Sequence, residues 1–195
     1  MIAGIVLSAG KSERMGRPKA LLPFRGKTFL ENILASVSQS SIGYTVVVLG
    51  RYREQIERTI ALPAAVFNPD YEQGMITSFQ TGIRALPSGT AGAVLFLVDN
   101  PLVQPGTIDA LVKRFEANRV IVPTFQGRRG HPVLFASEIL DGILTLPSSV
   151  GANAVLRRDP GRVIEVLQDT DEILVDIDTP EQYQQLLKNE CSGGL

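Results

Sequence analysis

Short apolar runs, most of them rich in β-branched residues, recur along the chain and predict buried strands. They cover residues 2–7, 45–49, 65–67, 93–98, 120–122, 132–135, 163–167 and 173–175. These runs are apolar throughout instead of alternating with polar residues, which is typical of strands that are covered on both faces. We therefore expect an α/β fold with a mostly parallel sheet.

Segments with helical periodicity separate the predicted strands. Helices are expected after a capping-box pattern at residues 28–31, around Ile56 and Ile60, along the face formed by Ile76, Phe79 and Ile83, from Pro105, over residues 137–143 and 149–157, and from Thr179-Pro180. No long linker interrupts this alternation. We expect one domain over residues 1–188 and a polar, frayed tail over residues 189–195.

Parallel strands end at a common edge of the sheet, and ligands of such sheets bind outside that edge. The loops after Leu7, Phe67 and Val98 should therefore lie together. Asp99 brings a carboxylate to this edge, although an Asp before Asn100-Pro101 could also cap a turn. Asp178 joins the edge if residues 173–177 run in the same direction.

Composition narrows the class of function. Apolar residues make up 44% of the 195 residues, which is enough for a core. There are 19 Lys and Arg and 20 Asp and Glu, so the net charge is −1 and no nucleic-acid or membrane partner is expected. A single Cys excludes a disulfide framework and favours a reducing, cytoplasmic setting. A single His, His131, excludes metal sites that need several imidazoles.

The loop at residues 8–19, called the first loop below, carries most of the candidate chemistry. It has one acid and four cations among small residues, the cations being Lys11, Arg14, Arg17 and Lys19. Backbone N–H groups of such a loop can surround phosphate oxygens while cations neutralise them, which suits a triphosphate. The Walker A spacing and the G-x-G-x-x-G pattern are both absent, and a solvated surface loop remains an alternative.

Five blocks of sequence resemble the nucleotidyltransferases related to the molybdenum cofactor cytidylyltransferase, the MobA-like NTP transferase family. The blocks are residues 7–19 with Leu21-Leu22-Pro23, Asn68 with residues 74–78, residues 97–102, residues 129–133 and residues 175–180. They occur in the order typical of the family and span nearly the whole chain.

The resemblance implies a three-layer, Rossmann-like nucleotidyltransferase fold. It implies Mg²⁺-dependent transfer of a nucleotidyl group from a nucleoside triphosphate to the terminal phosphate of molybdopterin, with release of pyrophosphate. Relatives that transfer guanylyl groups usually have Gly-Gly where this chain has Ala9-Gly10, so the resemblance favours CTP. The family places a metal-binding Asp at Asp99 and a second metal or substrate contact at Asp178, a role that Asp176 could share.

Site residues follow from the loop and the resemblance together. We expect Lys19, Arg14 and Asp99 to carry catalysis, with Lys19 at the α-phosphate and Arg14 at the β- and γ-phosphates. The predicted nucleotide-binding residues are Leu7, Ser8, Ala9, Gly10, Lys11, Ser12, Gly74, Thr77 and Ser78, the predicted acceptor-binding residues are Arg129, His131 and Asp178, and the predicted Mg²⁺ ligands are Asp99 and Asp178. A phosphate acceptor is already ionised at pH 7 and needs no general base, so a structural role for His131 is the alternative to acceptor binding.

Two alternatives stay open at this point. The same chemistry could act on a sugar or polyol phosphate. A non-catalytic carrier could instead hold a nucleotide or the molybdenum cofactor and hand that cofactor to an enzyme. For the nucleotidyltransferase itself, the expected partners are CTP, a molybdopterin-type acceptor and, transiently, a molybdoenzyme or its maturation factor. A hydride-transfer enzyme is disfavoured because the dinucleotide glycine pattern is missing.

Overall fold

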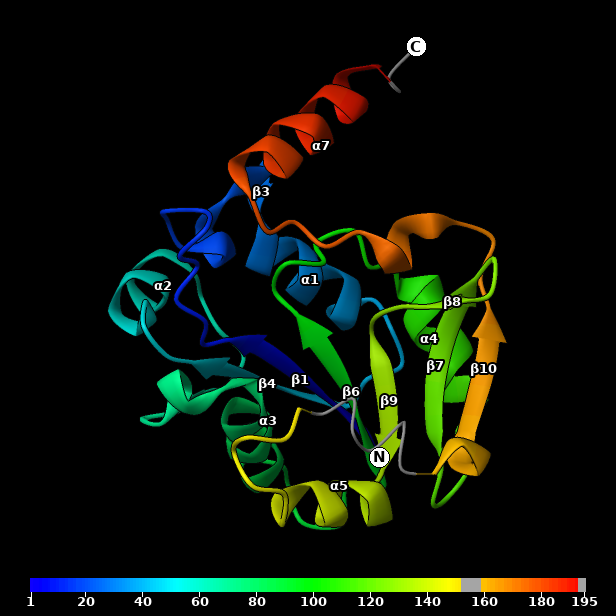
Figure 1. The fold of residues 1–195 in the computed structure, drawn as a ribbon. Helices are drawn as coiled ribbons and strands as arrows, with labels where there is room; N and C mark the ends of the chain where they lie inside the picture. Colours follow the sequence, from blue (N-terminus) through cyan, green and yellow to red (C-terminus); the bar gives the residue numbers. More distant parts are fainter. Residues whose placement is uncertain (152–158, 193–195) are drawn as a thin grey trace.

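A central sheet organises the computed structural model, which describes residues 1–151 and 159–192 (Figure 1). Its eight strands are β1 (Ile2–Ser8), β4 (Tyr44–Leu49), β5 (Ala65–Phe67), β6 (Gly92–Leu97), β7 (Val120–Phe125), β8 (Arg128–Arg129), β9 (Val133–Ala136) and β10 (Val163–Leu167). Seven of them lie in the order β10-β7-β9-β6-β1-β4-β5, and β8 pairs with β7. A separate small sheet joins β2 (Pro23–Phe24) to β3 (Lys27–Thr28).

Most strands of the central sheet share one direction. β1 is parallel to β4 and β6, β4 is parallel to β5, and β7 is parallel to β10. β9 is antiparallel to both of its neighbours, β6 and β7, and β8 is antiparallel to β7. The remaining six strands therefore end at the same edge of the sheet. The expected α/β fold with a mostly parallel sheet is confirmed.

Helices cover both faces of this sheet, so the fold has three layers (Figure 1). They are α1 (Phe29–Ser38), α2 (Arg53–Thr59), α3 (Met75–Arg84), α4 (Pro105–Lys113), α5 (Ser137–Leu144) and α7 (Pro180–Ser192). Ile5 and Leu7 of β1 pack in one core with α3 and α5, whereas Val6 packs in the other with α1, α2 and α4. None of the helices in the described ranges is long and apolar enough to cross a membrane.

A third apolar cluster joins α7 to the chain that follows the first loop. Its buried members are Met15, Leu22, Phe24, Phe29, Leu102, Ile177, Tyr183 and Leu186. The ring of Tyr183 packs edge-on against that of Phe29, with centroids 5.8 Å apart, and its hydroxyl donates to the Pro23 carbonyl at 2.6 Å. An ion pair between Arg25 and Glu190 adds a surface contact. The C-terminal helix thus fixes the segment on which the first loop ends.

Two predicted helix starts are confirmed by their cap contacts. At α1, the Thr28 N–H donates to the Glu31 carboxylate at 2.8 Å and the Glu31 N–H donates to the Thr28 hydroxyl at 3.3 Å, which is a capping box. At α7, the Thr179 N–H donates to the Gln182 side-chain oxygen at 3.0 Å, and the Gln182 N–H donates to the Thr179 hydroxyl at 3.3 Å.

The C-terminal third differs from the sequence prediction. Residues 173–175 are not a strand, because Asp171–Leu174 forms a 3₁₀ helix, η4. The Ile173 carbonyl there accepts from the His131 N–H at 2.9 Å, so the segment crosses the end of the β8–β9 connection instead of joining the sheet. The expected helix over 149–157 falls mostly on residues 152–158, outside the described residues. Residues 189–192 belong to α7, which spans Pro180–Ser192.

Two tight hairpins were not predicted from the sequence. The β2–β3 turn is Arg25-Gly26 and the β7–β8 turn is Gln126-Gly127, and all four residues have φ between 48° and 74°. Left-handed backbone at both central residues is what a two-residue type I′ turn requires, and glycine supplies the second position in each.

Candidate active site

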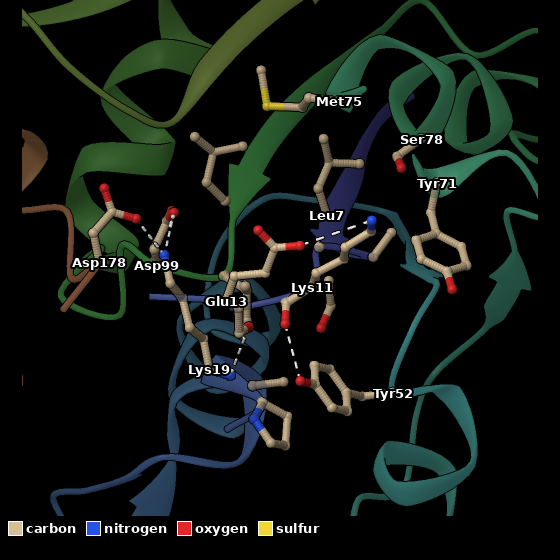
Figure 2. Close-up of a pocket in the computed structure, with 18 of the residues that line it drawn as sticks. Leu7, Lys11, Glu13, Lys19, Tyr52, Tyr71, Met75, Ser78, Asp99 and Asp178 are labelled. Atoms are coloured by element: carbon tan, nitrogen blue, oxygen red, sulfur yellow. Dashed lines mark hydrogen bonds and ion pairs between the residues drawn. The ribbon is translucent and has the colours of Figure 1, made fainter. Parts of the chain in front are cut away.

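A cavity of about 510 Å³ opens at the carboxyl edge of the sheet, beyond the ends of β1 and β6 (Figure 2). This is the edge at which parallel sheets bind ligands. Of the predicted nucleotide-binding residues, Leu7, Ser8, Ala9, Gly10, Lys11, Ser12, Gly74 and Ser78 line the cavity. Arg14, Lys19, Asp99 and Asp178 line it as well. The structure therefore brings the first loop and the two predicted carboxylates to one place.

Hydrogen bonds hold the first loop in a fixed shape around Ser12. The φ of Ser12 is 50°, in the left-handed region, and its carbonyl accepts from the Gly16 N–H at 3.0 Å. Its hydroxyl accepts from the Lys19 N–H at 3.2 Å. From outside the loop, the Tyr52 hydroxyl donates to the Lys11 carbonyl at 2.9 Å. These contacts give the loop a defined structure, unlike the solvated loop of the alternative.

Close backbone packing fixes the beginning of the first loop. A Cβ atom on Gly50, at the end of β4, would lie 2.3 Å from the carbonyl oxygen of Ala9. That oxygen also accepts from the Arg51 N–H at 3.3 Å. Gly50 is needed here because two backbone segments approach too closely for any side chain.

Lys19 lies between the two predicted carboxylates, as Figure 2 shows. Its Nζ is 3.1 Å from Asp99 Oδ2 and also hydrogen-bonds Asp178 Oδ1, and only 10% of the Lys19 side chain is exposed. Arg14 Nη2 contacts the other oxygen, Asp178 Oδ2, at 2.8 Å. The hydrogen bond from Lys19, with the charges of Lys19 and Arg14, holds the pKa of Asp178 below its usual range. Asp99 Oδ1 is buried and has no hydrogen-bond partner among the described residues.

Asp178 reaches this cluster without belonging to the sheet. The N–H of Ile177 donates to the backbone carbonyl of Asp99 at 2.9 Å, which ties the segment before α7 to the end of β6. The N–H of Asp178 itself donates to the Gln182 side chain at 2.8 Å. The segments that carry Asp99 and Asp178 therefore lie side by side, as predicted. A single backbone hydrogen bond joins them in place of the expected strand pairing.

Two further titratable groups adjoin the carboxylates. Partial loss of water, followed by the charges of Asp99 and Asp178, raises the pKa of Asp176 to about 6, while Lys19 acts in the opposite direction. The residue as a whole is exposed, so water screens these charges in part. Burial lowers the pKa of His131, and the charge of Asp99 opposes that change. Of the carboxylates Asp99, Asp176 and Asp178, only Asp99 and Asp178 line the cavity.

The predicted acceptor-binding residues are not all brought together. Arg129 lies on β8 and pairs with Glu165 of β10 at 2.8 Å. Neither Arg129 nor His131 lines the cavity, although His131 is close enough to Asp99 to respond to its charge. Of the three, Asp178 alone faces the cavity.

The start of α3 forms the opposite wall. Gly74, with a φ of 116°, precedes the helix. The buried side chain of Asn68 donates to the hydroxyls of Thr77 and Ser78, both at 2.9 Å. Thr77 does not line the cavity, because its hydroxyl turns inward to the carbonyls of Asp70 and Gly74, each at 2.9 Å. Thr77 is therefore placed to hold the wall together, and Ser78 to face the cavity.

Comparison with known families agrees with this geometry. Residues 4–170 match the model of the MobA-like NTP transferase domain. The chain belongs to this family. The region matched contains the first loop and the central sheet except for the first two residues of β1, so the resemblance seen in the sequence is confirmed.

Proteins with different names are similar to this chain over nearly its full length. "Nicotine blue oxidoreductase" of Paenarthrobacter nicotinovorans is 30% identical, covering 95% of this chain and 96% of that protein. "Purine catabolism protein PucB" of Bacillus subtilis is 31% identical, covering 93% and 94%. "Molybdenum cofactor cytidylyltransferase" of Escherichia coli is 29% identical, covering 92% of each.

A solved structure shares the fold. Rv0371c of Mycobacterium tuberculosis superposes with a TM-score of 0.84 at 29% identity, over 96% of this chain and 97% of that one. A structure described as the complex of the same protein with manganese gives a TM-score of 0.81 at 28% identity, over 96% and 98%.

Several residues that line the cavity were not predicted as site residues from the sequence, and Tyr52, Tyr71, Glu72 and Met75 are among them. Glu72 pairs with Lys11 at 3.0 Å across the cavity. Met75 belongs to one of the blocks that carry the resemblance, and this position could have marked it as a site residue. In the structure Met75 is 44% exposed. The positions of Tyr52 and Tyr71 depend on the segments after β4 and β5, in which no sequence motif marks a tyrosine as a site residue.

Proposed function

We propose that the protein transfers the nucleotidyl group of a nucleoside triphosphate to an acceptor phosphate with the help of a divalent cation. The observation that carries this proposal is Lys19, the last residue of the first loop, placed between Asp99 and Asp178 in the wall of the cavity. Membership of the MobA-like NTP transferase family supports the same chemistry.

The cavity suits a triphosphate nucleotide. Its volume of about 510 Å³ lies within the range of about 300–1,000 Å³ that is usual for small-molecule sites. One wall is the first loop, which presents the small residues Ser8, Ala9 and Gly10 and, further on, the cations Lys11 and Arg14. Backbone N–H groups and cations together can neutralise the phosphate oxygens.

The two carboxylates fit a hard divalent cation such as Mg²⁺. Mg²⁺ is usually held by one or two carboxylates together with substrate phosphates, not by an all-protein cage. Asp99 Oδ1, which is buried and without a partner among the described residues, is an oxygen in need of such a ligand. Asp99 and Asp178 would hold the ion. Bound there, it would offset charge on the phosphates during transfer.

The protein groups then act by position and charge. An oxygen of the acceptor phosphate forms a bond to the α-phosphorus, the bond from that phosphorus to the bridging oxygen breaks, and pyrophosphate leaves. The acceptor oxygen is ionised at pH 7, so no side chain has to remove a proton. Lys19 is assigned to the α-phosphate and Arg14 to the departing β- and γ-phosphates, where both stabilise negative charge.

We further propose CTP as the donor and molybdopterin as the acceptor. The relative from Escherichia coli is named for this reaction. Ala9-Gly10, in place of the Gly-Gly pair of guanylyl-transferring relatives, supports the choice of CTP. Ala9 lines the cavity with its backbone held against Gly50, so its side chain occupies a fixed position in the site.

The test combines the purified protein with Mg²⁺, one of the four nucleoside triphosphates, and molybdopterin. Pyrophosphate release and the dinucleotide product are measured. We expect turnover with CTP and a loss of at least roughly 100-fold in the Asp99→Asn variant, because a metal ligand contributes several kcal/mol and each 1.36 kcal/mol is tenfold. Asp141→Asn, an exposed carboxylate on α5, is the matched control and should keep full activity.

Each outcome decides one part of the proposal. Turnover with a sugar or polyol phosphate but not with molybdopterin would refute the acceptor. Turnover with GTP in preference to CTP would refute the donor. Binding of nucleotide without turnover on any acceptor phosphate, or full activity of Asp99→Asn, would refute nucleotidyl transfer by this site.

A further inference from the structure

Lys19 occupies the place between Asp99 and Asp178 that a divalent cation would take. Of the four carboxylate oxygens, Asp99 Oδ2 and Asp178 Oδ1 are bonded to Lys19 Nζ and Asp178 Oδ2 is bonded to Arg14 Nη2. Asp99 Oδ1 is the one oxygen of the pair without a partner among the described residues. A metal ion that arrives alone therefore meets carboxylates that are already neutralised.

Burial and a backbone hydrogen bond hold Lys19 in this position. Its side chain is 10% exposed, and its backbone N–H is fixed by the Ser12 hydroxyl at 3.2 Å. An ammonium and a divalent cation repel each other strongly at the distance set by shared carboxylate ligands, the more so where water is largely excluded. The two cations consequently compete for the pair, and a metal can enter fully when Lys19 has another anionic partner.

The first loop supplies such a partner when a triphosphate is bound. Lys19 and Arg14 both line the cavity, as do the small residues that would surround the phosphates. Arg14 is 68% exposed, so its side chain is free to move toward a ligand. Phosphate oxygens would draw both cations away from the carboxylates and at the same time supply ligands to the metal.

We propose that Lys19 is the counter-ion that reserves the Asp99–Asp178 pair, so that a divalent cation binds well only together with the nucleotide. This inference rests on the proposed function, since it assumes that metal and triphosphate share the site. It gives Lys19 a second role besides stabilising charge on the α-phosphate: coupling the binding of the two ligands. Such coupling is reciprocal, so the nucleotide also binds better with the metal.

Binding of Mn²⁺, followed by electron paramagnetic resonance, tests the role without any turnover. Affinity is measured with and without a non-reacting α,β-methylene analogue of CTP. In the wild type we expect weak binding of Mn²⁺ alone and a gain of roughly tenfold or more with the analogue, within the range of about 5–150-fold usual for coupled sites. In Lys19→Met, Mn²⁺ alone should bind roughly tenfold tighter than in the wild type, and most of the gain from the analogue should disappear.

Three variants make the outcome specific. Lys11→Met removes a charge from the same cavity but from a residue that pairs with Glu72, so it should leave the affinity for Mn²⁺ alone nearly unchanged. Arg14→Met frees one oxygen of Asp178 and, because Arg14 is exposed, does not threaten folding; it should tighten Mn²⁺ binding by a smaller factor. In the double variant Lys19→Met with Asp99→Asn, Mn²⁺ alone should no longer bind more tightly than in the wild type.

The failures are distinguishable. If the analogue promotes Mn²⁺ binding in the wild type but neither Lys19→Met nor Arg14→Met binds Mn²⁺ alone more tightly, the counter-ion role is wrong and the proposed function stands. If Lys11→Met binds Mn²⁺ alone as much more tightly as Lys19→Met does, the counter-ion role is also wrong, because loss of any positive charge in the cavity would then explain the tighter binding. If Mn²⁺ binds to no form, even with the analogue, the metal-dependent function itself is wrong.

Discussion

The close approach of Gly50 to Ala9 allows a sharp prediction about the first loop. In Gly50→Ala, the new Cβ atom would lie 2.3 Å from the Ala9 carbonyl oxygen and 2.9 Å from its carbonyl carbon. Both contacts are with backbone, which cannot rotate away as a side chain can. The loop that begins at Ala9 must therefore move relative to the end of β4.

The size of that movement sets the expected effect. Ordinary van der Waals contact begins near 3.4 Å, so the oxygen has to shift by about 1 Å. Overpacking of this kind costs about 1–3 kcal/mol of folding free energy, or about 2–12 °C in Tm for a chain of this length. A displacement of about 1 Å in a group that positions substrate can also reduce the rate about 100-fold.

The assay measures Tm and kcat/KM for pyrophosphate release on Gly50→Ala and on a matched control. Gly106→Ala makes the same chemical change in α4, where a Cβ meets nothing within 4 Å. The control should keep full activity and equal or slightly higher stability, since alanine favours a helix. Wild-type Tm and kcat/KM in Gly50→Ala would refute the argument that this contact holds the first loop.

Three other predictions concern the site and its support. Tyr183→Phe removes the hydroxyl that donates to the Pro23 carbonyl at 2.6 Å, and thermal unfolding should show a loss of about 1 kcal/mol, or 2–4 °C. The pKa of Asp178 is held below its unfolded value of about 3.9, so its ion pair with Lys19 stabilises the fold above about pH 4 and is lost as the pH falls through the folded pKa. Urea unfolding should accordingly show a steeper loss of stability below pH 4 in the wild type than in Asp178→Asn, and parallel curves would contradict this. Ala9→Gly should raise the ratio of kcat/KM for GTP to that for CTP, and an unchanged ratio would exclude this position from base selection.

Elements fixed by local pattern were predictable from the sequence. Apolar runs located every strand of the central sheet except β8, and the capping-box residues Thr28 and Glu31 located the start of α1. The rule that ligands bind at the carboxyl edge, together with the cations of the first loop, placed Lys19 and Asp99 in one site. These inferences succeed because burial, helix capping and strand direction depend on near neighbours or on a single topological rule.

Elements fixed by tertiary contacts were not predictable. Ile173 belongs to an apolar triplet that reads as a strand, but its carbonyl is bonded to the His131 N–H and its segment turns into η4. Arg129 stands in a block that resembles the family, yet it faces Glu165 and not the cavity. Tyr52 and Tyr71 become cavity walls through loop geometry that no local pattern records. In each case a partner distant in sequence decides the outcome.

The order of the elements along the chain also has a consequence for biosynthesis. All eight strands of the central sheet are complete at Leu167, and the family match ends at residue 170, but Asp178 and α7 come afterwards. Every residue of the sheet is therefore synthesised before the second carboxylate and before the helix that packs on the third apolar cluster. A fragment cut near residue 170 for recombinant expression would retain the strands and lack half of the carboxylate pair. Under the proposed function, activity therefore requires residues beyond 170, whereas the strands of the sheet do not include any of them.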